Sequence, residues 1–460
     1  MSKDIVLVPL DSRPVNSDIP KLICAAAGLE CEIPDQDMLG KYMNPGNCDK
    51  IADWLLKKSA ENYVLSLDML LYGGLVASRG SISNPYSLQK GFSAISELKK
   101  KNPNSKILCF STIRRLSTTV YSEESMTEWQ NMNCYLKAFY SHDLEMAAVL
   151  KKKIKPDVIQ QYDLLRKRNF ENNIKAIELV SKGSIDFLLL PQEDCFPNGP
   201  QTQEQLTMSE KILSLGLSEK VFLHNGADEA AQELVSKVAN PREKKISVLC
   251  DCPSKLNEIM EFEDRPFQTN LFSHMKALNF IQDYDSQTIL YIAFAEPQTC
   301  VRHIKTALAY GKKVILLDLI APNGGCKELI SEMIRSDLLR QLCGYSAWNT
   351  ASNSLGTALA FCALTDMKIN RKRISELLVR NLVDDFLYQR IYRQVLDERF
   401  KKDIHNMQAV DKKTREDIKK EFVSCANKFL TESGFRGVQI TDFCFPWERT
   451  FECSVTCSSQ

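Results

Sequence analysis

Two adjacent carboxylates, Asp228 and Glu229, stand at the end of a short apolar stretch with the sequence VFLHNGADEA. Two carboxylates in contact raise the pKa of one of them, so one group can stay protonated while the other stays charged. General acid/base catalysis uses this division of roles, and glycoside hydrolysis is the main example. We therefore expect Glu229 to act as general acid/base and Asp228 as the orienting or stabilising carboxylate.

A second acid pair, Glu193 and Asp194 in the stretch PQED, also follows an apolar run and forms a rival catalytic couple. Either pair has an ordinary alternative role at the start of a helix, because Asp and Glu are favourable in the first helical turn. The sequence alone therefore leaves open which pair is catalytic.

Both pairs follow short runs that are apolar throughout and alternate with helix-like segments. Such runs indicate parallel strands buried on both faces. Eight runs predict an α/β fold with a parallel (β/α)8 barrel-like core, and open doubly wound parallel sheets are the alternative. The runs are residues 5–10, 63–67, 107–110, 185–190, 220–223, 246–250, 289–294 and 314–317.

The domain organisation follows from the same pattern. Residues 1–330 should form the barrel-like catalytic domain, with a charged helical insertion near residues 115–182. Residues 331–460 should form a helical C-terminal region that packs on the barrel, with its clearest helices at residues 371–396 and 412–430. No G-x-G-x-x-G follows the first run and no G-x-x-x-x-G-K-[ST] occurs, which removes the usual support for a dinucleotide or P-loop site.

Ligands of parallel α/β folds bind at the carboxyl ends of the strands. A carboxylate or an arginine follows every run, so we expect these residues to line one cavity that grips the substrate. Asp, Asn and Gly at these places also suit helix caps and turns, and His224 suits a structural hydrogen bond. The predicted substrate-binding residues of the strand ends are Asp11, Arg13, Asn16, Asp68, Tyr72, Arg79, Arg114, His224 and Asp318.

A late motif, YSAWNT, adds Trp348, Asn349 and Asn353 to the predicted substrate-binding residues. An aromatic ring beside several amides can stack on a sugar and hydrogen-bond its hydroxyls. The alternative is a buried Trp348 with Asn349 capping a helix that begins near Ala351.

Residues His224 to Glu229, HNGADE, resemble the H-x-G-G-D-E signature of the family 20 β-N-acetylhexosaminidases, which are (β/α)8-barrel enzymes. The resemblance implies that Asp228 orients the acetamido group of the substrate, which attacks the anomeric carbon, while Glu229 is the general acid/base. Asp11 and Arg13 are similar to a family D-x-x-R whose arginine holds sugar hydroxyls, although the spacing here is one residue shorter. Ala227 stands where the family has glycine, and the D-E pair follows the fifth run rather than the fourth.

Five longer motifs resemble, over nearly the whole chain, a bacterial family defined only as a domain of unknown function. The motifs are VPLDSRPVN, LDMLLYGGLVASR, PQEDCFPNGPQ, NGADEA and YSAWNTASNSLGTALA. This resemblance implies no mechanism.

The leading interpretation is a glycoside hydrolase that cleaves a small sugar, for example an N-acetylhexosaminide, without a cofactor. A second interpretation is a hydrolase that binds Mg²⁺ or Mn²⁺ through strand-end aspartates, because both ions favour oxygen ligands. The aspartates are Asp11, Asp68, Asp194, Asp228 and Asp318, whereas His142, His274, His303 and His405 show no metal-ligand spacing. A third interpretation is a non-catalytic sugar- or metabolite-binding protein.

The composition is that of a globular protein: 460 residues, 44% hydrophobic and 25% charged, with a net charge of +1. This balance argues against nucleic acid or an anionic membrane as a partner. The N-terminus has no signal-peptide pattern, and no apolar stretch approaches the roughly 18 residues of a membrane span. The 16 cysteines contain no C-x-x-C. We therefore expect a cytoplasmic protein with reduced thiols.

Overall fold

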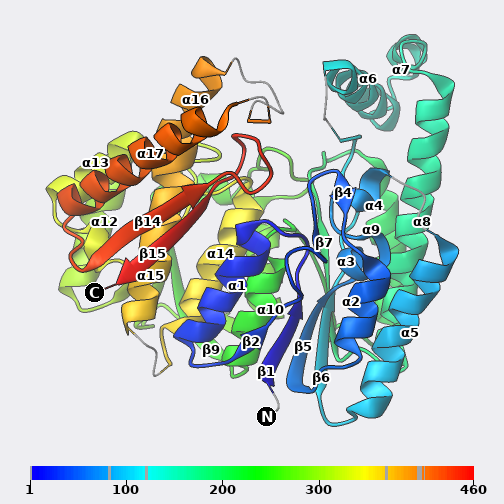
Figure 1. The fold of residues 1–460 in the computed structure, drawn as a ribbon, viewed down its shortest axis with the longest axis horizontal. Coiled ribbons are helices and arrows are strands. Elements are labelled where there is room, and N and C mark those ends of the chain that lie inside the picture. The colour runs from blue at the N-terminus through cyan, green and yellow to red at the C-terminus, as the bar shows by residue number, and fades with distance from the viewer. Residues whose placement is uncertain are drawn as a thin grey trace. The chain divides into compact units, whose positions relative to one another are not determined.

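The computed structural model describes residues 3–80, 84–119, 123–367, 371–400, 407–408 and 410–459 (Figure 1). The chain divides into two compact units, each assembled from three segments. The first unit contains Met1–Ser12, Glu30–Leu234 and Ile259–Arg265, and the second contains Arg13–Leu29, Val235–Glu258 and Pro266–Gln460.

The first unit is built on a six-stranded sheet in the order β2-β1-β5-β6-β7-β8, in which all neighbours are parallel. The order reverses at β1, which has β2 on one side and β5 on the other, so this is a topological switch point. The strands are β1 (Lys3–Val8), β2 (Cys31–Glu32), β5 (Ala60–Ser66), β6 (Lys106–Phe110), β7 (Phe187–Gln192) and β8 (Val221–Asn225).

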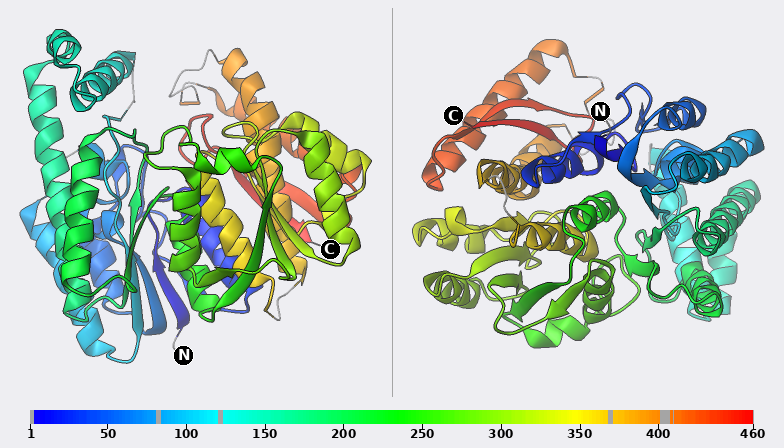
Figure 2. Two further views of the ribbon diagram at one scale, coloured as in Figure 1. Left: turned by 180° about the vertical axis from the view of Figure 1, so that it is seen from behind. Right: turned by 90° about the horizontal axis from the view of Figure 1, so that it is seen from below.

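Four helices of the first unit pack as one layer against a single face of this sheet (Figure 2). They are α2 (Cys48–Leu55), α5 (Pro85–Lys101), α8 (Pro156–Ser181) and α9 (Pro200–Ser214). The strand side chains in this layer alternate along each strand, as Val6 and Val8 do in β1 and Tyr63 and Leu65 do in β5. Burial of these apolar side chains is the main force that holds the layer to the sheet.

The remaining elements of the first unit are short or lie outside this layer. They are β3 (Gly40–Lys41), β4 (Asn44–Pro45), α3 (Leu67–Tyr72), α4 (Ala77–Gly80), α6 (Glu123–Tyr140) and α7 (Leu144–Lys151). α6 and α7 fall within the predicted helical insertion and contact each other, and α6 packs against α8 around a small apolar cluster that includes Met132 and Tyr162. α10 (Ala230–Ala239) begins in the first unit and ends in the second.

The second unit is built on a five-stranded parallel sheet in the order β10-β9-β11-β12-β13. This order repeats that of the first sheet, with the first strand again inside and the second at the edge. The strands are β9 (Lys244–Cys250), β10 (Phe280–Gln282), β11 (Thr288–Ala293), β12 (Lys313–Asp318) and β13 (Gly344–Ser346).

Helices cover both faces of the second sheet. α12 (Pro297–Ala309) and α13 (Lys327–Arg335) share a buried apolar cluster with β11 and β12. α14 (Ala351–Leu364) contacts β11, β12 and β13, and it also packs on α11 (Phe267–Ala277) and α1 (Pro14–Ala26).

The C-terminal part of the second unit combines helices with an antiparallel hairpin. The helices are α15 (Arg371–Asn381), a π-helical segment at Leu382–Tyr392, α16 (Arg393–Arg399) and α17 (Lys412–Glu432). The hairpin pairs β14 (Val438–Cys444) with β15 (Ser454–Ser459). Aromatic rings join the two, because Phe422 of α17 lies 4.4 Å from Phe443 of β14, centroid to centroid.

The predicted α/β class with parallel sheets is confirmed, and each of the eight apolar runs contains a strand. The described strands do not close into one barrel. Five runs belong to the first open sheet and three to the second, which is consistent with the doubly wound alternative. None of the helices in the described part of the chain combines the length and the apolar composition needed to cross a bilayer.

Candidate functional site

The turn from β8 into α10 carries the stretch that the sequence singled out. β8 ends at Asn225, and Gly226 follows with φ of 94°, a left-handed conformation that favours glycine. The Gly226 N–H donates to the Gln192 carbonyl of β7 at 2.9 Å, which fixes the turn to the neighbouring strand. The Glu233 N–H then donates to the Glu229 carbonyl at 3.0 Å, so the two glutamates lie one helical turn apart on the same face.

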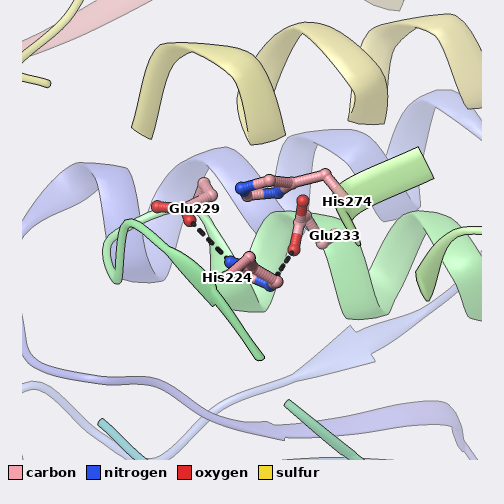
Figure 3. A group of neighbouring side chains, drawn as sticks. All are labelled: His224, Glu229, Glu233 and His274. Atoms are coloured by element: carbon pink, nitrogen blue, oxygen red, sulfur yellow. Dashed lines mark ion pairs between the residues drawn. The ribbon is translucent and has the colours of Figure 1, made fainter. Parts of the chain in front are cut away.

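His224, Glu229 and Glu233 form a fully buried group, with side chains that are 0% exposed (Figure 3). His224 Nδ1 lies 3.9 Å from Glu229 Oε1, and His224 Nε2 lies 3.3 Å from Glu233 Oε2. One ligand atom from each of the three lies within 4.8 Å of the others. All three belong to the first unit, whereas His274, which Figure 3 also draws, belongs to α11 of the second.

The hydrogen bonding of His224 fixes which ring nitrogen carries the proton of the neutral imidazole. His224 Nδ1 lies 2.9 Å from the Asn225 carbonyl oxygen, which can only accept, so Nδ1 is the donor. The lone pair of Nε2 is then directed toward the Glu233 carboxylate. A lone pair and a carboxylate oxygen 3.3 Å apart repel each other unless a proton or a cation lies with them.

The surroundings of Glu229 favour a bound cation over a single proton at this group. Neither of its carboxylate oxygens accepts a hydrogen bond from any residue that the structure describes. Burial raises the pKa of Glu229 well above its usual value, and the charge of Glu233 raises it further. A single proton on His224 would satisfy Glu233, but Glu229 would then be buried either charged or protonated, in both cases without a hydrogen-bond partner among the described residues, which is costly. A divalent cation would satisfy all three side chains together.

The geometry of the group fits a metal ion of the first transition series or zinc. Metal–ligand bonds of about 2.1 Å at a tetrahedral angle place two ligand atoms about 3.4 Å apart. The separation of His224 Nε2 from Glu233 Oε2 is 3.3 Å. A backbone carbonyl that holds the other ring nitrogen of the histidine is the usual outer-shell partner of such a ligand.

Asp228 is buried next to this group, and its charge is among the causes that raise the pKa of Glu229. Its predicted role as orienting carboxylate stays a prediction.

The rival acid pair lies at the end of β7, where both of its members form ion pairs. Glu193 pairs with Arg79 of α4 and also accepts from the Arg115 N–H at 3.2 Å. Asp194 pairs with the Arg115 guanidinium at 2.7 Å. Each carboxylate thus has a cationic partner, and these contacts connect the loops; the predicted catalytic role of the pair stays a prediction.

Asp68 and Tyr72 lie on the short helix α3, directly after β5. Asp68 is 1% exposed and accepts from both the N–H and the hydroxyl of Thr112, at 2.9 and 2.7 Å. Burial raises its pKa to about 7, while the Thr112 bonds oppose this rise and the charge of Glu193 adds to it. The Tyr72 hydroxyl accepts from Asn172 at 2.8 Å, and the Arg168 guanidinium lies 4.3 Å from its ring centroid.

Asp11 and Arg114 complete the predicted residues of the first unit. Asp11 is buried after β1, and an added Cβ at Gly74 would lie 3.7 Å from its own Cβ, so the YGGL loop passes close to it. Arg114 is buried after β6 and donates to the Arg79 carbonyl at 3.2 Å. The first unit therefore brings together, at the carboxyl edge of one sheet, the predicted residues that follow β1, β5, β6, β7 and β8.

Six predicted residues belong to the second unit: Arg13, Asn16, Asp318, Trp348, Asn349 and Asn353. Arg13 precedes α1 and lies over the Trp447 ring at 5.0 Å. Asn16 is buried within α1. Asp318 ends β12 and accepts from the Cys326 N–H at 2.8 Å, and burial raises its pKa to about 6.

The YSAWNT motif has the helix start that the alternative interpretation expected, with a different capping residue. α14 begins at Ala351, and Thr350 rather than Asn349 caps it, because the Thr350 hydroxyl accepts from the Asn353 N–H. Asn349 adopts φ of 59°, a conformation that Asn tolerates. Trp348 is buried edge-on against Phe451, with centroids 6.5 Å apart.

Glu233 was not among the predicted catalytic or substrate-binding residues. The signal that could have found it is the spacing H-x4-E-x3-E, which places a strand-end histidine before two glutamates at i and i+4 of a helix start. That spacing was not recognised because Asp228 and Glu229 were interpreted as a catalytic acid pair.

A family model matches residues 5–456, which is nearly the whole chain, and its description is "Protein of unknown function (DUF4127)". The chain belongs to the DUF4127 family. Comparison of this DUF4127 chain with curated proteins and with solved structures gives no match. The expected membership of a family of unknown function is confirmed, and the likeness to family 20 β-N-acetylhexosaminidases stays a prediction.

Proposed function

We propose that this DUF4127 chain is a metal-dependent hydrolase whose metal ligands are His224, Glu229 and Glu233. The observation that carries the proposal is the Glu229 carboxylate, which is 0% exposed and accepts no hydrogen bond from the described residues. Folding buries two carboxylates and an imidazole within 4.8 Å of one another, at a high desolvation cost. A bound cation offsets that cost.

The ligand set differs from the strand-end aspartates of our sequence-based metal hypothesis, and it changes the expected ion. An imidazole with two carboxylates suits Zn²⁺, Mn²⁺ or Fe²⁺, whereas Mg²⁺ prefers an all-oxygen set. Three protein ligands leave at least one position for water. A metal there would supply Lewis-acid polarisation and lower the pKa of that water.

The chain's own residues would prepare this site in three ways. The Asn225 carbonyl holds the Nδ1 proton of His224, so the lone pair of the neutral ring lies on Nε2, the nitrogen that would bind the ion. Gly226 leaves room for the Glu229 carboxylate, because an added Cβ at this position would meet Glu229 Oε1. Asp228 lies next in the chain to Glu229 and is the nearest candidate in the sequence for a proton acceptor.

The test is the metal content of the purified full-length chain, measured by inductively coupled plasma mass spectrometry. We expect about one equivalent of a transition metal in the wild type, and its loss in His224→Ala, Glu229→Gln and Glu233→Gln. Asp68→Asn is the matched control, because Asp68 is a buried strand-end carboxylate of the same sheet outside the group. Absence of bound metal after reconstitution with Zn²⁺, Mn²⁺ and Fe²⁺ would refute the proposal.

A glycoside hydrolase that works with carboxylates alone is the second candidate. The raised pKa of Glu229, caused by its burial, favours it, because a carboxyl that holds its proton to higher pH is better suited to serve as general acid. A panel of aryl glycosides, N-acetylglucosaminides included, separates the two candidates. Hydrolysis that EDTA abolishes and a divalent ion restores supports the metal enzyme. EDTA-resistant hydrolysis that Glu229→Gln removes supports the glycosidase.

A further inference from the structure

Four buried or partly buried arginines gather in the first unit around the loops that follow β6 and β7. Three of them have carboxylate partners. Arg79 pairs with Glu193, Arg115 with Asp194 at 2.7 Å, and Arg166 with Glu204 at 2.7 Å. Arg114 is the fourth.

Arg114 is only 3% exposed and forms no ion pair among the described residues; the charges of Glu193 and Glu204 act on it, but these two carboxylates already pair with Arg79 and Arg166. Its Nη2 donates to the Arg79 carbonyl at 3.2 Å, and its guanidinium lies 5.2 Å from the Tyr162 ring centroid. Its Nε and Nη1 find no acceptor in the part of the chain that the structure describes. Burial lowers the pKa of Arg114 to about 10, which leaves the group charged at neutral pH. A buried positive charge without an ion-pair partner costs folding free energy unless an anion binds beside it.

Hydrogen bonds to the backbone fix the loop that carries Arg114, so the Arg114 side chain is preorganised. The Arg114 carbonyl accepts from Arg166 Nη1 at 3.2 Å and from Gln192 Nε2 at 3.3 Å. The Leu116 N–H donates to the Asp194 carbonyl at 2.9 Å. A guanidinium fixed in this way loses little freedom when it binds an oxyanion.

Two further donors follow on the same loop. The hydroxyls of Thr118 and Thr119 are buried and have no hydrogen-bond partner among the described residues. Each hydroxyl can donate a hydrogen bond to a carboxylate or phosphate oxygen.

The loop lies on the sheet edge that also carries the His224 group. Ile113 bridges to Gln192 of β7, and Gln192 pairs with Asn225 of β8. Neighbouring strands are about 4.8 Å apart, so the backbone at Arg114 and the backbone at His224 are separated by roughly 10 Å. A small substrate can span that distance.

We propose that Arg114 binds an oxyanion, a carboxylate or phosphate group carried by the substrate. This proposal rests on the proposed function and extends it: the substrate that the proposed hydrolase binds at this edge of the sheet carries an anionic group. The direct anion-binding claim does not require a metal. The positive charge fits one negative charge on the ligand, and either Nε or Nη1, which lie on different edges of the guanidinium, can donate a hydrogen bond to one of its oxygens.

The experiment measures anion binding to the EDTA-treated full-length protein by isothermal titration calorimetry and by thermal shift. Inorganic phosphate and malonate are the probes, and chloride at equal ionic strength is the reference. We expect at least one probe to bind and to raise the melting temperature. Arg114→Gln should weaken that binding about tenfold or more, and Arg114→Lys, which keeps the charge without the guanidinium, should fall between.

Two control variants complete the design. Arg335→Gln removes an arginine that is 68% exposed, and it should bind the probe as the wild type does. His224→Ala should also keep anion binding, which separates this site from the proposed metal site. Wild-type protein that binds neither probe, or Arg114→Gln that binds as tightly as wild type, overturns the inference.

The two failures are distinguishable. Normal metal content without anion binding rejects the anion site alone, whereas anion binding without metal rejects the metal site alone. If Arg114→Gln is unfolded by circular dichroism, Arg114→Lys decides: unchanged phosphate and malonate affinity overturns the inference, and weaker affinity in a folded protein supports it.

Discussion

Replacement of Asp68 by asparagine tests the environment of the strand-end carboxylates. Asp68 is 1% exposed and accepts from the Thr112 N–H at 2.9 Å and from the Thr112 hydroxyl at 2.7 Å. Asparagine has the shape of the protonated acid. Its oxygen can accept from the Thr112 N–H, and its amide can donate to the Thr112 hydroxyl oxygen, so both hydrogen bonds survive.

The effect of the substitution should depend on pH. Burial raises the pKa of Asp68 from 3.8 to about 7, so the folded chain binds this proton more tightly than the unfolded chain does. The resulting stabilisation is complete below about pH 4 and is lost as the pH rises to about 7. A pKa difference of about 3 corresponds to at most about 4 kcal/mol. Asp68→Asn should therefore match the wild type near pH 4 and exceed its stability at pH 8.

Urea unfolding followed by circular dichroism between pH 4.5 and 8 measures this difference. Asp37→Asn is the control, because Asp37 is an exposed acid of the same unit and its loss should change stability by less than about 0.5 kcal/mol. The reasoning fails if Asp68→Asn is less stable than the wild type at pH 8. That result would mean that the pKa of Asp68 is not raised, because the Thr112 hydrogen bonds to the carboxylate outweigh the effect of burial.

Three further outcomes are expected. Zn²⁺ at one hundred times its dissociation constant should stabilise the wild type by about 2.7 kcal/mol, or about 5–10 °C in scanning fluorimetry, and Glu229→Gln should abolish the shift. Gly226→Ala should lose metal, because the added methyl meets the Glu229 carboxylate; Gly216→Ala, also at positive φ but with open space, should keep it. Arg166→Gln should lower the free energy of unfolding in urea by about 3–5 kcal/mol, because Glu204 stays buried without its partner. Each prediction would be contradicted by one result. These results are a Zn²⁺-induced rise in melting temperature in Glu229→Gln, bound metal in Gly226→Ala, and unchanged stability in Arg166→Gln.

The strands could be predicted because each is a continuous apolar run, and parallel strands buried on both faces produce that pattern. Seven of the described strands lie outside these runs: β2, β3, β4, β10 and β13 have two or three residues each, too few to show a period, and β14 and β15 form a hairpin in the region expected to be helical. The choice between a barrel and open sheets, which were the alternative, could not be made for another reason. Whether eight parallel strands close into a barrel or open into two sheets depends on which strands pair, and a run of apolar residues carries no information about its partner.

The site could be predicted in part. Glu229 was identified because an acid beside a glycine turn at a strand end is unusual, and the structure places it fully buried. The ion pair of Arg79 with Glu193 could not be predicted, because the two residues are 114 positions apart and only the fold brings them together. The same holds for Arg114, whose importance lies in the absence of an ion pair among the described residues rather than in any motif.

The polar residue after every strand, which suggested one lined cavity, has an architectural explanation in several places. Asp68 after β5 accepts the Thr112 N–H from the loop after the neighbouring β6. In the second unit Asp251 after β9 accepts the N–H groups of Phe294, Ala295 and Glu296 from the loop after the neighbouring β11, at 2.7–2.8 Å. Both sheets thus use a strand-end carboxylate to tie down the loop of the next strand. A carboxylate whose oxygens are filled by backbone N–H groups is already satisfied by the fold. Glu229 and Arg114 differ because the fold buries them and leaves both carboxylate oxygens of Glu229, and Nε and Nη1 of Arg114, without hydrogen-bond partners among the described residues. That difference, rather than position at a strand end, is the physical reason to place a ligand at these two residues.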